Sequence, residues 1–119
     1  MKRKEHLTIT RLVGLTGEIE DPRRRYGNRR HEMVDILIIT LLAIICGCET
    51  WKDIRLYGAQ KKEWLRTFLR LLNGVPSVST FPRTFLWIKP DALEEVYRQW
   101  VRPYELLINN LIIFHLQFR

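Results

Sequence analysis

Arginine side chains form the most conspicuous chemical grouping in this 119-residue chain, and the chemistry they suit is phosphate binding. A guanidinium group binds a phosphate through two parallel hydrogen bonds. The segment DPRRRYGNRR, residues 21–30, also contains the turn-forming residues Pro22, Gly27 and Asn28, so we expect an irregular loop. That loop would present five arginines to solvent: Arg23, Arg24, Arg25, Arg29 and Arg30. A loop whose charge only keeps it soluble is the alternative interpretation.

A second basic set is spaced for one face of a helix. Lys62, Arg66 and Arg70 recur every four residues, and Lys61 lies beside them. The same segment, residues 60–72, carries an apolar stripe at helical spacing, so the pattern predicts an amphipathic helix with a basic ridge. A solvated helix face is the simpler explanation. The stripe consists of Trp64, Leu65, Phe68, Leu69 and Leu72.

The stretch NGVPSVSTFPRTFLWI has the order of a helix-turn-helix. Asn73 and Gly74 end one helix, and Ser77 or Ser79 can cap a second helix with Pro82 in its first turn. In a helix-turn-helix the second helix enters the major groove with its N-terminal side chains nearest the bases. The candidate contacts are therefore Ser77, Ser79, Thr80 and Arg83. Plain helix packing would produce the same pattern.

The remaining reactive side chains predict neither a metal site nor catalysis. Cys46 and Cys48 form a lone CxC, for which the three histidines supply no matching second pair, so we expect both thiols to be buried as small apolar groups. The acids lie near predicted helix starts, where they favour capping and solubility over metal binding. They are Asp35, Asp53, Asp91, Glu94 and Glu95. We expect no cofactor, no metal and no small-molecule substrate.

Charge is distributed unevenly. The net charge is +7, and residues 1–31 hold nine lysines and arginines against four acids. This asymmetry suggests a polyanionic partner. The hydrophobic content of 46% is ordinary for one globular domain with a real core. The N-terminal segment has neither an apolar signal-peptide core nor a small-residue cleavage site, so a cytoplasmic location is expected.

The element that must organise these residues runs from Met33 to Cys48. Between Met33 and Ile45 only Asp35 and Thr40 interrupt a run of apolar residues. A helix with this composition is apolar nearly all round, which places it at the centre of a domain or in a membrane. A membrane-spanning helix needs about 20 apolar residues, so a buried central helix is favoured and a membrane span is unlikely.

Five further helices complete the predicted fold. A short helix covers residues 7–15, and a second begins at Thr50, which caps it with Asp53 three positions on, and is closed by Gly58. With the helix at 60–72 and the hairpin after it, a last helix begins at Pro90 or Asp91 and packs Leu93, Val96, Tyr97, Trp100 and Val101 inward. We predict an all-α bundle of about five helices around the central apolar helix over residues 1–103, with a helix-turn-helix-like hairpin, and an apolar tail, 104–119, of uncertain fold.

Four successive blocks carry a family resemblance. In order they read DPRRR, HEMVDILIITLLAIICGCETWKDI, GAQKKEWLRTFL and NGVPSVSTFPRTFLWIKPDALEEVYRQWV. This order resembles the N-terminal associated domain of DDE-type insertion-sequence transposases, which include the H-repeat-associated proteins, over about residues 7–103. The resemblance implies that an RNase H-like catalytic domain, whose acids bind divalent metal, follows in the family.

The chain departs from that pattern after Trp100, where nothing matches the Asp-Gly-Lys motif that supplies the family's first catalytic acid. We therefore expect a truncated, non-catalytic front domain that contributes DNA binding at element ends. A full-length transposase or a second copy of the chain could also be a partner. Three alternatives remain open: a protein-interaction or dimerisation module with Trp51, Trp64 and the tail as contact surface, a membrane-inserted protein, and a remnant without function.

Overall fold

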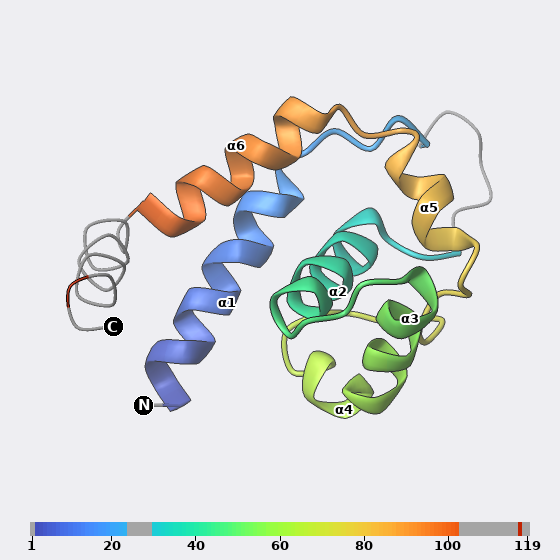
Figure 1. Ribbon diagram of the computed structural model, residues 1–119, viewed down its shortest axis with the longest axis horizontal. Helices are drawn as coiled ribbons and strands as arrows, with labels where there is room; N and C mark the ends of the chain where they lie inside the picture. The colour runs from blue at the N-terminus through green and yellow to red at the C-terminus, as the bar shows by residue number, and fades with distance from the viewer. Residues whose placement is uncertain (1, 24–29, 103–116, 118–119) are drawn as a thin grey trace.

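The computed structural model, in Figure 1, describes residues 2–23, 30–102 and 117, and these residues form an all-α fold. This confirms the predicted fold class, with six helices in the described part of the chain. In chain order they are α1 (Lys2–Gly17), α2 (Met33–Ile45), α3 (Trp51–Gln60), α4 (Lys62–Leu65), α5 (Thr80–Phe85) and α6 (Pro90–Val101). Of the predicted tail, 104–119, only Gln117 lies within the described residues.

Helix α2 is the buried centre of the fold, as predicted. Helices α1, α3 and α5 all pack against it. Thr40 is tolerated in this apolar environment because its hydroxyl donates a hydrogen bond to the Ile36 carbonyl, at 2.8 Å. The helix ends earlier than expected, at Ile45, where Gly47 adopts a positive φ of 94°. Its last two residues, Ile44 and Ile45, are exposed.

Helix α3 begins as predicted but does not end at Gly58. The Thr50 hydroxyl accepts a hydrogen bond from the Asp53 amide at 3.1 Å, which is the expected N-cap. Gly58 lies inside the helix, and a Cβ atom there would come within 3.2 Å of Ile39 and 3.0 Å of Val75. Glycine at this position therefore permits close approach to α2, which is a packing role and not the predicted role of a helix stop.

The predicted helix over 60–72 is wrong in its second half. Helix α4 ends at Leu65, although turns continue the backbone hydrogen bonding to Leu69. Leu69 and Leu71 are both buried, whereas Leu72, which the apolar stripe placed inward, is 69% exposed. Side chains two apart cannot share one helix face. The chain instead turns at Leu71, which has a φ of 43°.

The tight helix-turn-helix is likewise not formed. Residues 66–79 separate α4 from α5, in place of the three or four residues typical of that motif. Helix α5 is six residues long, and no side chain caps it at Ser79. Its aromatic side chains pack on the start of α3, where the Trp51 ring lies 6.4 Å from Phe81 and 5.5 Å from Phe85 between centroids.

Helices α1 and α6 lie side by side (Figure 1). Helix α1 is longer than predicted, and the Arg11 guanidinium donates to the carbonyl oxygens of Gln99 and Trp100, at 2.6 and 3.0 Å. Helix α6 begins at Pro90 as predicted and buries Val96, but Tyr97, which was expected to pack inward, is 47% exposed. These carbonyl oxygens are at the C-terminal end of α6, where the helix dipole favours a positively charged partner such as Arg11.

Two smaller observations complete the fold. Cys46 is exposed and Cys48 is half-buried, so the prediction that both thiols are buried is wrong. Both follow the end of α2, where the chain has already reached the surface. Among the described residues, no helix combines the length and the apolar character needed to cross a lipid bilayer.

Candidate nucleic-acid interface

Helix α4 and the turn after it carry the second predicted basic set. Lys61, Arg66 and Arg70 are exposed and Lys62 is half-buried. The Arg66 amide donates to the Lys62 carbonyl at 3.0 Å, which keeps these two side chains one helical turn apart as predicted. Arg70 lies beyond the end of the helix, so a separate element must position it.

That element is the turn formed by residues 70–74. The Leu71 amide donates to Asp35 Oδ2 at 3.1 Å, and the Gly74 amide donates to the Leu71 carbonyl at 3.0 Å. Gly74 has a φ of 75°, a conformation that favours glycine. The Nζ atom of Lys62 lies 3.7 Å from the position that a Cβ atom would take on Gly74. The 70–74 turn therefore lies directly beside α4.

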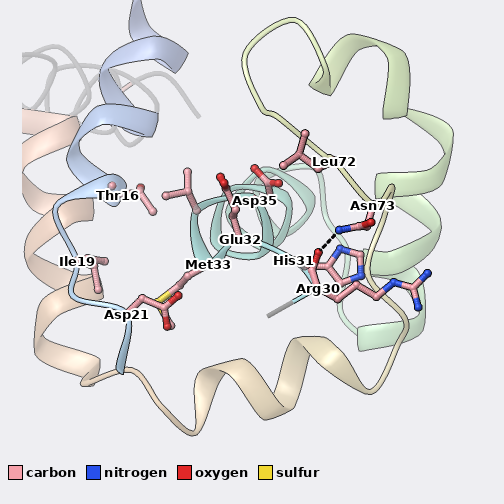
Figure 2. Close-up of a pocket in the computed structure, with 12 residues that line it drawn as sticks. Thr16, Ile19, Asp21, Arg30, His31, Glu32, Met33, Asp35, Leu72 and Asn73 are labelled. Carbon is pink, nitrogen blue, oxygen red and sulfur yellow. Dashed lines mark hydrogen bonds between the residues drawn. The ribbon is translucent and has the colours of Figure 1, made fainter. Parts of the chain in front are cut away.

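The same turn contacts the residues that lead into α2 (Figure 2). The Asn73 side-chain amide donates to the Arg30 carbonyl at 2.6 Å, the hydrogen bond drawn in the figure. The Arg70 guanidinium lies 3.0 Å from the Glu32 carboxylate. Arg30 itself is exposed. The structure thus brings cations from two predicted basic sets to one region, which we call the α4 basic surface: Arg30, Lys61, Lys62, Arg66 and Arg70.

A pocket of about 340 Å³ adjoins this surface, and Figure 2 shows its lining. Arg30, His31 and Asn73 lie on one side of it, and Thr16 and Ile19 lie on the other. Burial, together with the charges of Arg30 and Arg23, lowers the pKa of His31. At neutral pH this histidine is therefore uncharged and does not extend the basic surface.

Asp35 lines the same pocket, and its burial and its contact with the Leu71 amide contradict the prediction that it serves capping and solubility. It is 3% exposed, and burial raises the pKa of its carboxyl group, although the Leu71 amide partly opposes that rise. The sequence contained a signal: Asp35 is the one charged residue between Met33 and Ile45. A charge on the buried part of an apolar helix requires a partner.

Arg23 does not follow the expectation for the arginine loop. Its guanidinium donates to the Asp21 carboxylate at 3.0 and 3.2 Å and to the His31 carbonyl at 3.0 Å. The Arg23 side chain is only 15% exposed, so the prediction that it points into solvent is wrong. The three other arginines of that loop, Arg24, Arg25 and Arg29, lie outside the described residues.

The hydroxyl residues before α5 contact one another. Ser77 Oγ lies 2.9 Å from Thr80 Oγ1 and 3.3 Å from Ser79 Oγ. Ser77, Ser79 and Arg83 are exposed, as base contacts must be. However, α5 packs on α2 whereas α4 packs on α3, and α3 separates α4 from α5 in Figure 1. The structure therefore does not join this set to the α4 basic surface.

The carboxylates are dispersed through the fold. Glu94 pairs with Arg98 at 2.6 Å, and Glu95 accepts from the Gln99 amide at 3.0 Å. Within residues 2–23, 30–102 and 117, no group of three or more histidine, cysteine or acidic residues is arranged to hold a metal ion.

Comparison with known proteins gives the family. The family described as DDE_Tnp_1-associated matches residues 15–101. An "Uncharacterized protein in dhlA 3'region" of Xanthobacter autotrophicus is 44% identical over 82 residues, which are 69% of this chain and 28% of that protein. The "H repeat-associated putative transposase YhhI" of Escherichia coli K12 is 30% identical over 101 residues, which are 85% of this chain and 24% of that protein.

A third relative, the "Inactive transposase YbfQ" of E. coli K12, is 36% identical over 53 residues, 44% of this chain and 63% of that protein. The chain spans about a quarter of the length of the two longer relatives. No solved structure matches it. The family match covers most of the chain, in the place where the sequence suggested it, and the chain therefore belongs to the DDE_Tnp_1-associated family, the N-terminal associated domain of DDE transposases.

Proposed function

We propose that this domain binds DNA at the ends of an insertion sequence during transposition, and that it acts without catalytic acids of its own. The observation that carries the proposal is the α4 basic surface, where five cations from two separate stretches of the chain lie around α4 and the 70–74 turn. Transposition requires that element ends be held, and the names of two relatives contain the word transposase.

The charge of this surface is available to phosphate. The ion pair between Arg70 and Glu32 on this surface joins side chains that are 69% and 41% exposed. Ion pairs as exposed as this contribute about 0–1 kcal/mol, so a phosphate can replace the carboxylate at little cost. Arg66 and Lys61 are exposed on α4 beside it. The surface therefore suits the DNA backbone more than the edges of bases.

Catalysis would have to come from another part of a longer transposase. Three of the acids make structural contacts: Asp35 accepts the Leu71 amide on the 70–74 turn, and Glu94 and Glu95 pair along α6. A two-metal site requires convergent carboxylates around ions about 4 Å apart. We assign the chain a binding role only, with the catalytic site supplied elsewhere.

The test is a fluorescence-anisotropy titration of the purified chain with a random duplex and with a terminal-repeat duplex, each at two salt concentrations. Binding through phosphate releases counterions, so we expect affinity to fall steeply with salt. The triple variant Lys62→Ala, Arg66→Ala, Arg70→Ala should weaken binding to both duplexes. Its slope of log K against log salt should be shallower by about 0.9 for each lost phosphate contact.

A matched control removes the same charge elsewhere. The triple variant Lys89→Ala, Arg98→Ala, Arg102→Ala alters exposed cations on and beside α6. We expect its affinity to change less than that of the α4 variant and its slope to stay near that of the unmodified chain. Equal losses in the two variants would mean that net charge alone governs binding, and the assignment of the α4 basic surface would be wrong.

The other predicted contacts are separated by the same titration. Arg23, Arg24 and Arg25 changed to alanine should weaken binding across all sequences, and Ser79, Thr80 and Arg83 changed to alanine should reduce the preference for the terminal repeat. Arg23 will contribute least to the first result because its guanidinium is held by Asp21. If neither variant shows a loss of affinity or of sequence preference, DNA contact is confined to the α4 basic surface.

One observation favours a second function, a protein-interaction module. Ile44, Ile45 and Leu56 are each more than half exposed, and Trp64 is 43% exposed. Exposed apolar groups of this size can form a contact with a full-length transposase or a second copy. Analytical ultracentrifugation of the chain over a range of concentrations tests self-association, which should depend little on salt, in contrast to DNA binding.

A further inference from the structure

Asp35 places a carboxylate in a buried, apolar part of the fold, which costs free energy unless the carboxylate has a partner. Its carboxylate is almost completely removed from water in the otherwise apolar helix α2, and it accepts the backbone amide of Leu71, 36 residues along the chain. Burying a charged group is unfavourable unless hydrogen bonds replace its contacts with water. Asp35 lies in the first turn of α2, where an acid is favourable, but that position does not require the side chain to be buried. Its partner on the 70–74 turn is therefore the informative contact.

That turn contains an unfavourable backbone conformation. Leu71 has a φ of 43°, in the left-handed region that residues other than glycine rarely adopt. Such residues persist only when the surrounding structure fixes them. Two contacts fix Leu71: its amide is held by Asp35, and its side chain is 2% exposed. Without the carboxylate, the burial of one leucine and the exposed hydrogen bonds of Arg70 and Asn73 would have to hold the turn.

The position of the turn decides where the cations lie. Hydrogen bonds connect it to the start of α2 and the residues before it: Leu71 to Asp35, Arg70 to Glu32, and Asn73 to the Arg30 carbonyl. Figure 2 shows the last of these. The last two are exposed, where water competes with them, and only the first is buried. Because it is buried and its acceptor is a carboxylate, the hydrogen bond from Leu71 to Asp35 should be stronger than the two exposed hydrogen bonds.

We propose that Asp35 is a positioning residue for DNA binding: by holding the Leu71 amide, it fixes the 70–74 turn, and with it Arg70, on the α4 basic surface that also carries Arg30 and Lys62. This inference rests on the proposed function of the α4 basic surface. It makes a prediction opposite in sign to simple electrostatics. An acid beside a DNA-binding surface repels phosphate, so removing its charge should strengthen binding unless the acid positions the cations.

Three substitutions separate position from charge. Asp35→Asn removes the charge but keeps an acceptor oxygen in nearly the same place, whereas Asp35→Glu keeps the charge and displaces the acceptor by one methylene group. Asp35→Ala removes both. We expect Asn to bind DNA at least as tightly as the unmodified chain. Glu and Ala should bind about fivefold more weakly, as when one charged contact worth about 1 kcal/mol is misplaced.

The readouts are anisotropy titrations of the full chain against the random duplex at two salt concentrations, with circular dichroism to establish that each variant is folded. The Glu and Ala variants should also show a shallower salt slope, because fewer phosphates are contacted. Glu63→Gln is the control: it removes an exposed acid from α4 and should bind slightly more tightly. If Asp35→Ala does not fold, the comparison of the Glu and Asn variants decides.

Two results overturn this inference. One is unchanged or tighter binding by the folded Asp35→Glu variant, and the other is an Asn variant as weak as the Glu variant, since rescue by the retained oxygen is what positioning requires. These failures differ from a failure of the proposed function. If the Lys62, Arg66 and Arg70 triple variant binds as the unmodified chain does, the surface itself is wrong. If that triple weakens binding but Asp35→Glu does not, only the role of Asp35 is wrong.

Discussion

Helix α2 holds its two neighbours in different ways. It holds α3 by close apolar contact, in which Gly58 lets the helix approach Ile39. It holds the 70–74 turn mainly by polar contacts, through Asp35 and Glu32. Apolar contact contributes stability in proportion to buried area but has little directional preference, whereas a hydrogen bond fixes direction. We infer that the α3 side stabilises the fold and that the turn side orients the cations.

The largest effect should come from the apolar side. Ile39→Ala removes a side chain with no exposed surface at the contact between α2 and α3, and we expect a loss of about 2–5 kcal/mol in the free energy of unfolding. Leu72→Ala is the matched control from the turn side. Leu72 is exposed although the apolar stripe predicted burial, so its change should stay within about 0.5 kcal/mol. Urea denaturation measures both, and a Leu72 loss equal to that of Ile39 would contradict the described turn.

Gly58 offers a smaller change at the same apolar contact. A methyl group on Gly58 would meet Val75 at 3.0 Å and Ile39 at 3.2 Å, so Gly58→Ala should destabilise the fold by about 1–3 kcal/mol. Gly14→Ala in α1 is the control, because no described residue lies within 4 Å of its added Cβ. There alanine should stabilise the helix by about 0.5–1 kcal/mol. Thermal unfolding followed by circular dichroism compares them, and equal shifts would refute close approach at Gly58.

Features that depend on residues close together in the sequence could be predicted, and features that depend on distant residues could not. The position of α2, the Thr50 cap and the start of α6 at Pro90 were predicted correctly because each depends on residues within a few positions of one another. The end of α4 was not, because the conformation of Leu71 depends on a carboxylate 36 residues away. Gly58 was misjudged for a similar reason, since its contacts are on other elements.

The candidate site divides in the same way. The relation of Lys62 to Arg66 followed from helical spacing alone. Arg30 lies beside the 70–74 turn because its carbonyl accepts a hydrogen bond from Asn73, which is distant in the sequence. A local sequence pattern cannot predict that contact. Arg23 is different, since its partner Asp21 is only two residues away. A carboxylate so close in sequence was a visible reason to expect that this arginine would fold back onto the protein.

The smallest effect we predict is a pH dependence of stability that comes from protonation of the Asp35 carboxyl group. It tests the polar contact between α2 and the 70–74 turn. Burial and, less strongly, the charge of Glu32 raise the pKa of Asp35 above the ordinary value of 3.8, whereas hydrogen bonds from Leu71 and Arg70 and the Arg70 charge partly oppose the rise. The folded chain therefore binds this proton more tightly than the unfolded chain does. The resulting stability is present at acidic pH and is lost as the pH rises through the folded-state pKa.

The unmodified chain should consequently gain stability relative to Asp35→Asn when the pH is lowered from neutrality toward the ordinary aspartate range. His31 has the opposite effect on stability. Its pKa in the folded chain is lowered from 6.5, so its contribution to stability is present above pH 6.5 and is lost as the pH falls through the folded-state pKa. Since both proteins contain His31, its effect largely cancels in their difference. Urea denaturation at about pH 7 and about pH 5 measures that difference. A difference that moves in the reverse direction would mean that hydrogen bonds from the turn outweigh burial at Asp35, and the carboxylate would then be held even more firmly by the 70–74 turn than the described geometry indicates.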